Sequence, residues 1–245
     1  MSEKPIPSHQ LENLSSVQGK EYEPAFTRMT VSGKGSSGNS AFSHGVATRY
    51  GIPSDNVYHG GKIMREILGV DDSAVGYIKR PFNLDRQIDR QIEVLLAQAT
   101  RTPAIIEAKL GGVLNRHLEQ QSRSLRVITQ EPRVAVLKVA SLEKRAQIAQ
   151  SKPGNESISI EELIEKSLDR DKKDLAQWIR IHPWLAYYTD ILGRDAKDNE
   201  GQPIYDLVVD SSESSLEEDL DIAHEFLLTN GLVSEVRRSS LGAQS

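Results

Sequence analysis

The sequence contains no cysteine among its 245 residues, so disulfides and thiolate metal sites are excluded. It also lacks an excess of positive charge, because 30 Lys and Arg residues are set against 35 Asp and Glu residues. A general nucleic-acid surface normally needs a basic excess to neutralise phosphates, so we expect no nucleic-acid partner. No run approaches the roughly 20 apolar residues of a membrane span, and the first residues lack an apolar signal region. We therefore expect a cytoplasmic protein with no membrane partner.

The apolar content of 38% is enough for one sizeable core, so we expect a single large domain and a monomer. Residues 1–24 are polar, include three prolines and show no apolar period, which predicts a flexible lead-in. The domain is expected over residues 25–235, and residues 151–159 form a breaker-rich link within it. Residues 236–245 are expected to form a flexible tail.

Short apolar runs alternate with longer amphipathic runs along this domain. The short runs, whose length favours strands, are residues 25–32, 103–107, 133–139 and 204–209. The helical patterns cover residues 41–50, 63–68, 84–99, 112–121, 142–150, 160–181 and 216–229. Strands that alternate with helices predict an α/β fold with a mostly parallel sheet flanked by helices.

A segment rich in glycine and serine lies between the first predicted strand and the first predicted helix. It fits the phosphate-loop pattern G-x-x-x-x-G-K-[ST] at every position except the lysine, which is Asn39 here. Such loops point backbone N–H groups at phosphates, and the last hydroxyl, that of Ser40, reaches a magnesium ion. The missing lysine normally meets the outer phosphates, and Lys34 is the nearest replacement in the loop. The predicted ATP-binding residues are Gly33, Lys34, Gly35, Ser36, Ser37, Gly38, Asn39 and Ser40.

Several segments further along resemble, in the same chain order, motifs of the cytidylate kinase-like family of the archaeal type. Tyr58 to Glu66 resembles the segment Y-x-x-G-x-I-F-R-E, whose arginine binds the phosphate of a nucleoside monophosphate. The resemblance implies substrate contacts at Gly61 and Arg65. A surface arginine on an amphipathic helix is the alternative interpretation. Asn83 to Gln91 is similar to E-I-D-x-x-x-D-x-R-Q, which a solvated charged helix face fits almost as well.

Two later segments are similar to family motifs that contact the acceptor. Ile105 to Gly112 resembles L-E-G-R-L-A-G, with Lys109 in the place of the arginine. Asp169 to Asp174 resembles the R-D-x-x-D element after the lid, which implies that Arg170 and Asp174 contact the monophosphate. The same two residues are spaced for an ordinary i,i+4 salt bridge. Residues 204–212 closely resemble the final strand Y-D-L-V-I-D-T-S of the family.

The resemblance covers roughly residues 28–228, with an apparent insertion at 182–202. It implies a P-loop NTPase fold, a three-layer sandwich with a small helical lid at about residues 151–170. It also implies a nucleoside monophosphate kinase that uses ATP with Mg²⁺ and phosphorylates CMP or dCMP. Under this hypothesis the catalytic cations are Lys34 and Arg170, and Ser40 lies on the metal side.

Three departures from the family pattern leave other functions open. Asn39 and Lys109 replace a lysine and an arginine, and Gln177 stands where the family usually has a further arginine. The main alternative is therefore a degenerate loop protein that binds a nucleotide or a protein partner without phosphoryl transfer. A kinase for another small acceptor is a third possibility, because fold does not fix substrate.

The remaining candidate chemistry is sparse. Six histidines are scattered without metal-ligand spacing, so no structural metal is expected. Trp178 and Trp184, with Tyr187 and Tyr188, are able to stack a base, but aromatic residues beside a helix are more typical of packing.

Overall fold

The computed structural model describes residues 21–70, 83–98, 102–124 and 132–236. Five parallel strands form the central sheet in the order β3-β4-β2-β5-β6. They are β2 (Arg28–Gly33), β3 (Val57–His59), β4 (Ala104–Glu107), β5 (Arg133–Val139) and β6 (Leu207–Asp210). Two short strands, β1 (Tyr22–Pro24) and β7 (Val233–Glu235), pair antiparallel.

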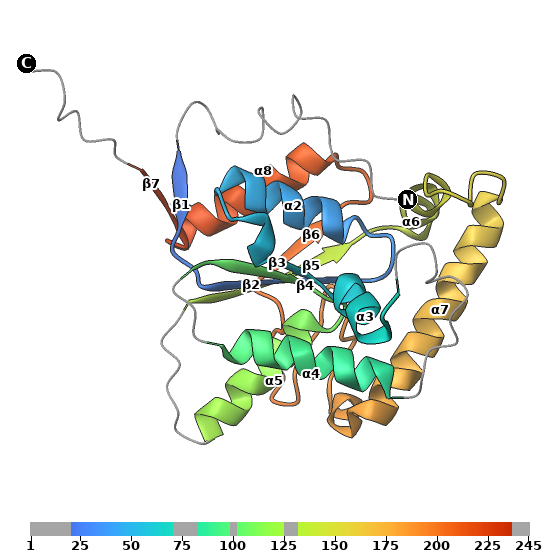
Figure 1. Cartoon of the computed structure of the whole chain (residues 1–245), viewed down its shortest axis with the longest axis horizontal. Helices are drawn as coiled ribbons and strands as arrows, with labels where there is room; N and C mark the ends of the chain where they lie inside the picture. Colours follow the sequence, from blue (N-terminus) through green and yellow to red (C-terminus); the bar gives the residue numbers. More distant parts are fainter. Residues whose placement is uncertain (1–20, 71–82, 99–101, 125–131, 237–245) are drawn as a thin grey trace, which may run out of the picture.

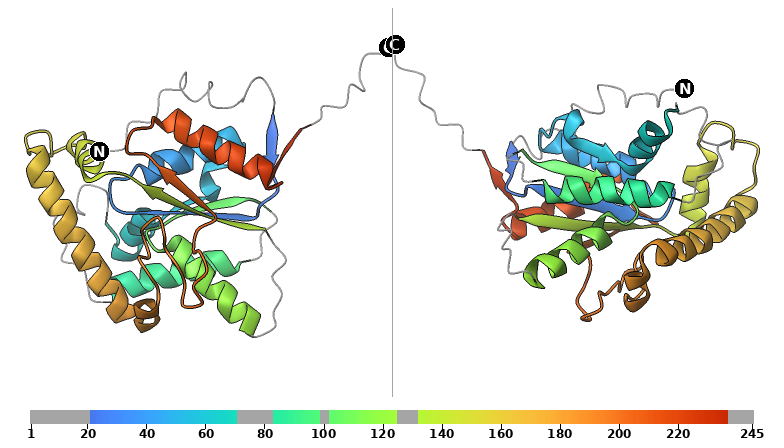
Figure 2. Two further views of the ribbon diagram at one scale, coloured as in Figure 1. Left: turned by 180° about the vertical axis from the view of Figure 1, so that it is seen from behind. Right: turned by 60° about the horizontal axis from the view of Figure 1, so that its bottom comes forward.

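Helices cover both faces of the sheet and confirm the predicted fold class. In Figure 1, α2 and α8 lie on one face, and α4 and α5 lie on the other. The long helix α7 runs along one side next to α6, and Figure 2 shows the same arrangement from behind and from below. The helices are α2 (Asn39–Arg49), α3 (Gly60–Leu68), α4 (Leu84–Ala97), α5 (Gly111–Ser124), α6 (Leu142–Gln150), α7 (Ile160–Ile181) and α8 (Leu216–Thr229), with short 3₁₀ turns η1 (Ser54–Asn56) and η3 (Pro183–Tyr187). None of the helices in the described part of the chain combines the length and apolarity needed to cross a membrane.

The strands are apolar on both faces because helices cover both faces. Successive side chains of a strand point to opposite sides, and β5 illustrates the consequence. Val134 and Val136 pack into the core under α2 and α8, whereas Ala135 and Leu137 pack into the core next to α4 and α5. Two apolar layers therefore hold the sheet and fix the positions of its strand ends.

The predicted elements agree with the observed ones where the periodic apolar pattern extends over many residues. The predicted ranges 133–139, 142–150, 160–181 and 216–229 coincide with β5, α6, α7 and α8. The three-residue strands β1, β3 and β7 were not predicted. Strand β1 lies within residues 1–24, which were expected to be a flexible lead-in, and its pairing with β7 joins residues 22–24 to the fold. The rest of that lead-in, residues 1–20, and the tail from residue 237 lie outside the described residues.

The segment 182–202, predicted as an insertion, lies between α7 and β6. It contains η3 and two antiparallel bridges, which join Thr189 to Lys197 and Lys197 to Pro203. Leu185 and Ile191 from this segment are buried in the core next to α4 and α5. The insertion is thus a packed part of the domain.

Candidate functional site

A cavity of about 910 Å³ lies at the carboxyl ends of the parallel strands, where α/β folds bind their ligands. Its wall is formed by the phosphate-type loop between β2 and α2, the start of α3, the turn after β4, and α7. Every residue predicted from the sequence to bind ATP, the acceptor or the metal lines this cavity. They are Gly33, Lys34, Gly35, Ser36, Ser37, Gly38, Asn39, Ser40, Gly61, Arg65, Lys109, Arg170 and Asp174.

The loop has the backbone geometry of an anion cradle. Ser36 has φ 62° and Gly38 has φ 81°, so both adopt left-handed conformations that turn backbone N–H groups toward one side. A side chain at Gly33 is excluded, because a Cβ there would lie 2.6 Å from the carbonyl oxygen of Lys138. Helix α2 begins directly after Gly38 and has no acidic residue in its first turn, so its positive end is left for an anion.

The side chain of Asn39 turns back into the loop. Its Oδ1 accepts a hydrogen bond from Ser37 Oγ at 3.1 Å, and its Nδ2 donates to the carbonyl oxygen of Gly33 at 3.4 Å. The carboxamide thus closes the loop on itself. A lysine at the same position would carry a charge on a longer side chain, so the substitution changes both the charge and the direction of this residue.

A carboxylate meets the last hydroxyl of the loop. Glu107, at the end of β4, accepts a hydrogen bond from Ser40 Oγ at 3.1 Å through its Oε2. The same oxygen lies 2.6 Å from Nδ1 of His59, the strand neighbour of Glu107 in β3. Since a carboxylate oxygen only accepts, Nδ1 carries the proton of that hydrogen bond. The arrangement places a hydroxyl and an oriented carboxylate next to each other at the start of α2.

Cationic side chains from α6, α7 and the link between them approach the loop. Arg145 Nε donates to the carbonyl oxygen of Gly35 at 2.9 Å, and its other two nitrogens bind Asp171 on α7 at 2.8 and 3.0 Å. Lys152, in the link between α6 and α7, donates to Ser36 Oγ at 3.3 Å. A Cβ added at Gly35 would lie 3.3 Å from the guanidinium of Arg170. Three cations from outside the loop therefore reach it.

The predicted acceptor residues form a second charged group within the same cavity. The ammonium of Lys109 pairs with the carboxylate of Asp174, and Arg170 Nε lies 3.8 Å from that carboxylate. The ammonium is also 5.7 Å from the ring centre of Trp178, a geometry that allows a cation–π contact. The i,i+4 pair expected from the sequence is present, and Lys109 extends it from α7 to the sheet. Gly61 and Arg65 line the cavity from α3, and a Cβ added at Gly61 would lie 3.5 Å from an Arg65 nitrogen.

No protein-family model and no curated protein matches the chain. Among solved structures, an uncharacterized protein from Eubacterium ventriosum is similar, with 10% identity and a TM-score of 0.51 over 82% of this chain and 98% of that one. A shikimate kinase from Acinetobacter baumannii has 10% identity and a TM-score of 0.49 over 91% and 99% of the two chains. A gluconokinase from Sinorhizobium meliloti has 15% identity and a TM-score of 0.47 over 85% and 95%. The likeness is one of fold.

Several residues of the cavity were not selected from the sequence. Glu107 is the clearest, and its signal was an acidic residue at the end of a buried apolar strand, PAIIE. His59 and Lys152 also line the cavity. On α4, Asp89 lines it as well, with Oδ2 2.8 Å from His182 Nε2, and burial raises the pKa of this carboxyl above its ordinary value.

One lysine lies beneath the loop rather than in the cavity. Lys138, at the β5 position paired with Gly33, is 2% exposed and donates to Asp219 at 2.6 Å. Its ammonium also lies 4.9 Å from the ring centre of Phe42, and burial lowers its pKa. Lys138 is not among the residues that line the cavity, and its ammonium is paired with Asp219 next to the loop.

Proposed function

We propose that the protein is an ATP-dependent phosphotransferase of the P-loop kinase type, which transfers a γ-phosphoryl group to a small acceptor. The observation that supports this most is the position of Arg170. Its guanidinium lies against Gly35 of the loop, and its Nε is 3.8 Å from Asp174, the partner of Lys109. A phosphate chain on the loop and an acceptor at Lys109 would meet at Arg170. Phosphoryl transfer depends mainly on such alignment and on positive charge around the migrating group.

In this proposal the residues 33–40 bind the phosphates of ATP through backbone N–H groups and the positive end of α2. Arg170 and Lys152 supply charge from the lid side, and Lys34 supplies it from the loop. Arg145 uses three of its five N–H groups to bind Gly35 and Asp171, so we assign it a positioning role. It holds the loop and α7 in a fixed relation, so that Arg170 stays over the loop.

Ser40 and Glu107 fit a magnesium ion that arrives with ATP. The hydroxyl and carboxylate oxygens are 3.1 Å apart, and Mg²⁺ prefers oxygen ligands, of which the protein commonly gives one or two and the phosphates and water give the rest. When bound, the ion neutralises charge on the outer phosphates. His59 would keep the Glu107 carboxylate oriented through its Nδ1 proton.

For the acceptor we propose CMP or dCMP, on the strength of the family resemblance. Arg65, Lys109 and Arg170 would bind its phosphate, and Asp174 would hold Lys109 and Arg170 in place. Gly61 lies in the first turn of α3, and its lack of a side chain would let the start of that helix approach the phosphate. The planar ring of Trp178 next to Lys109 offers an apolar surface near the acceptor.

A degenerate nucleotide-binding protein without transferase activity is the second candidate. The inward-turned carboxamide of Asn39 favours it, since that side chain closes the loop and leaves the usual lysine charge absent. In that case the loop would still bind a nucleotide, but no acceptor would be phosphorylated.

A coupled assay of ADP release, run with a panel of nucleoside monophosphates and small hydroxy compounds, separates the candidates. We expect CMP or dCMP to stimulate ADP release. We expect Glu107→Gln to lower the rate by roughly 10²-fold, the order found when one charge-stabilising group is lost. Glu225→Gln, at an exposed position of α8, should leave the rate unchanged. Stimulation by a hydroxy compound alone would replace the CMP assignment. ATP binding with no active acceptor would favour the degenerate candidate, and no ATP binding would overturn both.

A further inference from the structure

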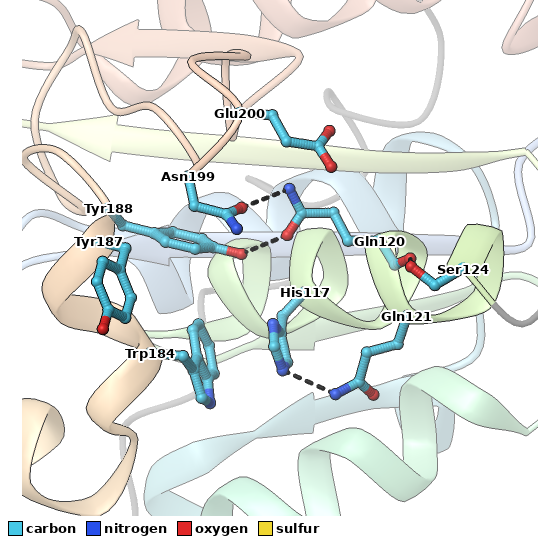
Figure 3. A pocket seen from close by; sticks show the side chains of 9 residues that line it. All are labelled: His117, Gln120, Gln121, Ser124, Trp184, Tyr187, Tyr188, Asn199 and Glu200. Carbon is cyan, nitrogen blue, oxygen red and sulfur yellow. Dashed lines mark hydrogen bonds between the residues drawn. The ribbon is translucent and has the colours of Figure 1, made fainter.

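A second cavity, of about 420 Å³, lies between the second half of α5, η3 and the loop at Asn199 (Figure 3). None of its described lining residues lines the phosphate-loop cavity. Its rings come from Trp184, Tyr187 and Tyr188 on the insertion and from His117 on α5. Trp178, which the sequence analysis grouped with Trp184, instead lines the first cavity.

Most of these rings are held rigidly before any ligand arrives. The indole of Trp184 stacks on the His117 imidazole, with ring centres 3.8 Å apart and planes 3° apart. Tyr188 meets the same indole edge-on at 5.3 Å, and its hydroxyl donates to Gln120 at 2.8 Å. These contacts confirm packing for Trp184 and Tyr188. They also mean that a ligand would lose little side-chain entropy on binding.

The loop that carries the polar rim is rigid as well. The side chain of Asp198 is fully buried and accepts hydrogen bonds from Arg116 at 2.7 Å and from the backbone N–H of Glu200 at 2.8 Å. Gln120 also donates to Asp198 and to Asn199. The carboxylate of Glu200 is therefore carried by a fixed backbone at the edge of the cavity.

Packing does not explain Tyr187. Its side chain lines the cavity together with Trp184, is 75% exposed, and makes no polar or ring contact within the described part of the chain. A large ring held in water next to a fixed aromatic pair is typical of a binding surface, where tyrosine and tryptophan are enriched.

The charge of the wall selects the kind of ligand. None of its nine described lining residues is a lysine or an arginine, and the nearby Arg116 is paired with Asp198 and Glu119. Glu200 supplies a carboxylate. His117 Nε2 bonds the Gln121 side chain at 2.9 Å, and burial, with the nearby His182, lowers the His117 pKa, so the imidazole is neutral at pH 7. Aromatic faces and a carboxylate together attract a cation.

We propose that this cavity binds an organic cation, an alkylammonium or guanidinium group, against Tyr187 and Trp184 and with Glu200 as the counter-charge. The group is either a free amine or the basic side chain of a peptide. The site is independent of the phosphate-loop cavity and of its proposed activity.

The two tryptophans make a direct test possible, because Trp178 serves as an internal control. The indole N–H signals of the full chain are followed by NMR during titration with choline, with its uncharged analogue 3,3-dimethyl-1-butanol, and with the peptide Gly-Lys-Gly. We expect choline or the peptide to shift the Trp184 signal saturably while Trp178 stays in place. The uncharged analogue should bind several-fold more weakly. Tighter binding of the peptide would identify a protein side chain as the source, and tighter binding of choline a free amine.

Matched variants give the second readout. Glu200→Gln and Tyr187→Ala should each weaken binding about two- to fivefold, as expected for exposed cation–π and charge contacts. Asp195→Asn, an exposed carboxylate on the same insertion, should change nothing. The proposal is overturned if neither cation shifts Trp184, if the uncharged analogue binds equally well, or if Glu200→Gln and Tyr187→Ala bind like the parent.

Discussion

The side-chain amide of Asn39 donates to the carbonyl oxygen of Gly33, so the residue at the usual lysine position is bonded to the first residue of its own loop. The loop is therefore closed by a neutral contact where a charge is normally supplied. The carboxamide does not disturb the backbone cradle, since Ser36 and Gly38 still adopt left-handed conformations. The departure from the motif is one of charge rather than of shape.

Asn39→Lys is expected to increase ATP-Mg²⁺ affinity, because a charge-assisted hydrogen bond to an outer phosphate is worth about 1.5–3 kcal/mol, or roughly ten- to a hundredfold. Calorimetric titration measures this directly. Asn39→Ala is the matched control, because it removes the contact with Gly33 without adding a charge. Equal affinities for the lysine and alanine variants would show that the loop does not place an outer phosphate near position 39.

The cation that replaces the missing lysine can be identified by comparing ATP with AMP. Lys152 donates to Ser36 from the link between α6 and α7, whereas the sequence had pointed to Lys34 within the loop. We expect Lys152→Ala to weaken ATP binding more than AMP binding, because its contact would be with the outer phosphates. Lys34→Ala is measured in parallel. A larger difference for Lys34 would restore the sequence-based assignment, and equal losses for both nucleotides would exclude either lysine from this role.

The elements whose periodic pattern covers many residues could be predicted from the sequence, and the short strands could not. Helix α7 and strand β5 have many residues in one apolar pattern, so their bounds follow from periodicity. Strand β3 has three residues and no measurable period. Strand β1 forms by pairing with β7, which lies more than 200 residues away in the chain. Local propensity does not predict a pairing over that distance.

The candidate site divides in the same way. Motif order was enough to select residues that lie in one cavity, from Gly33 to Asp174. Glu107 was overlooked because its partner, Ser40, lies 67 residues earlier in the chain. The two residues come together only because β2 and β4 are neighbours in the sheet. Arg145 was also overlooked, because its bonds to Gly35 and Asp171 depend on how α6 and α7 pack.

The acceptor side gives a prediction about Arg65. If its guanidinium binds an acceptor phosphate, Arg65→Ala should weaken CMP binding by roughly ten- to a hundredfold, with ATP binding and the fold nearly unchanged. Arg90→Ala, an exposed arginine on α4, is the control and should bind CMP like the parent. If Arg65→Ala also binds CMP as the parent does, Arg65 is a surface residue and the acceptor assignment fails.

The pH dependence of stability is expected to report on His224, which is buried in α8 with its Nδ1 2.9 Å from the hydroxyl of Tyr50. Burial, with the nearby charge of Arg49, lowers the His224 pKa below its ordinary value of 6.5. As the pH falls below 6.5, His224 takes up a proton in the unfolded chain but stays neutral in the folded chain. The unfolded state then binds more protons, so the free energy of unfolding decreases as the pH falls from 6.5 through the folded pKa.

Urea unfolding at a series of pH values between 7 and 5 measures this slope. His224→Gln should flatten it, because the titrating group is gone, although stability at pH 7 also changes. Tyr50→Phe is the matched control, since it removes the hydroxyl partner and leaves the buried imidazole, so the slope should persist. His117, whose pKa is also lowered by burial, contributes in the same window, and some slope should remain in His224→Gln. A slope that His224→Gln leaves unchanged would mean that the folded protein tolerates a protonated His224.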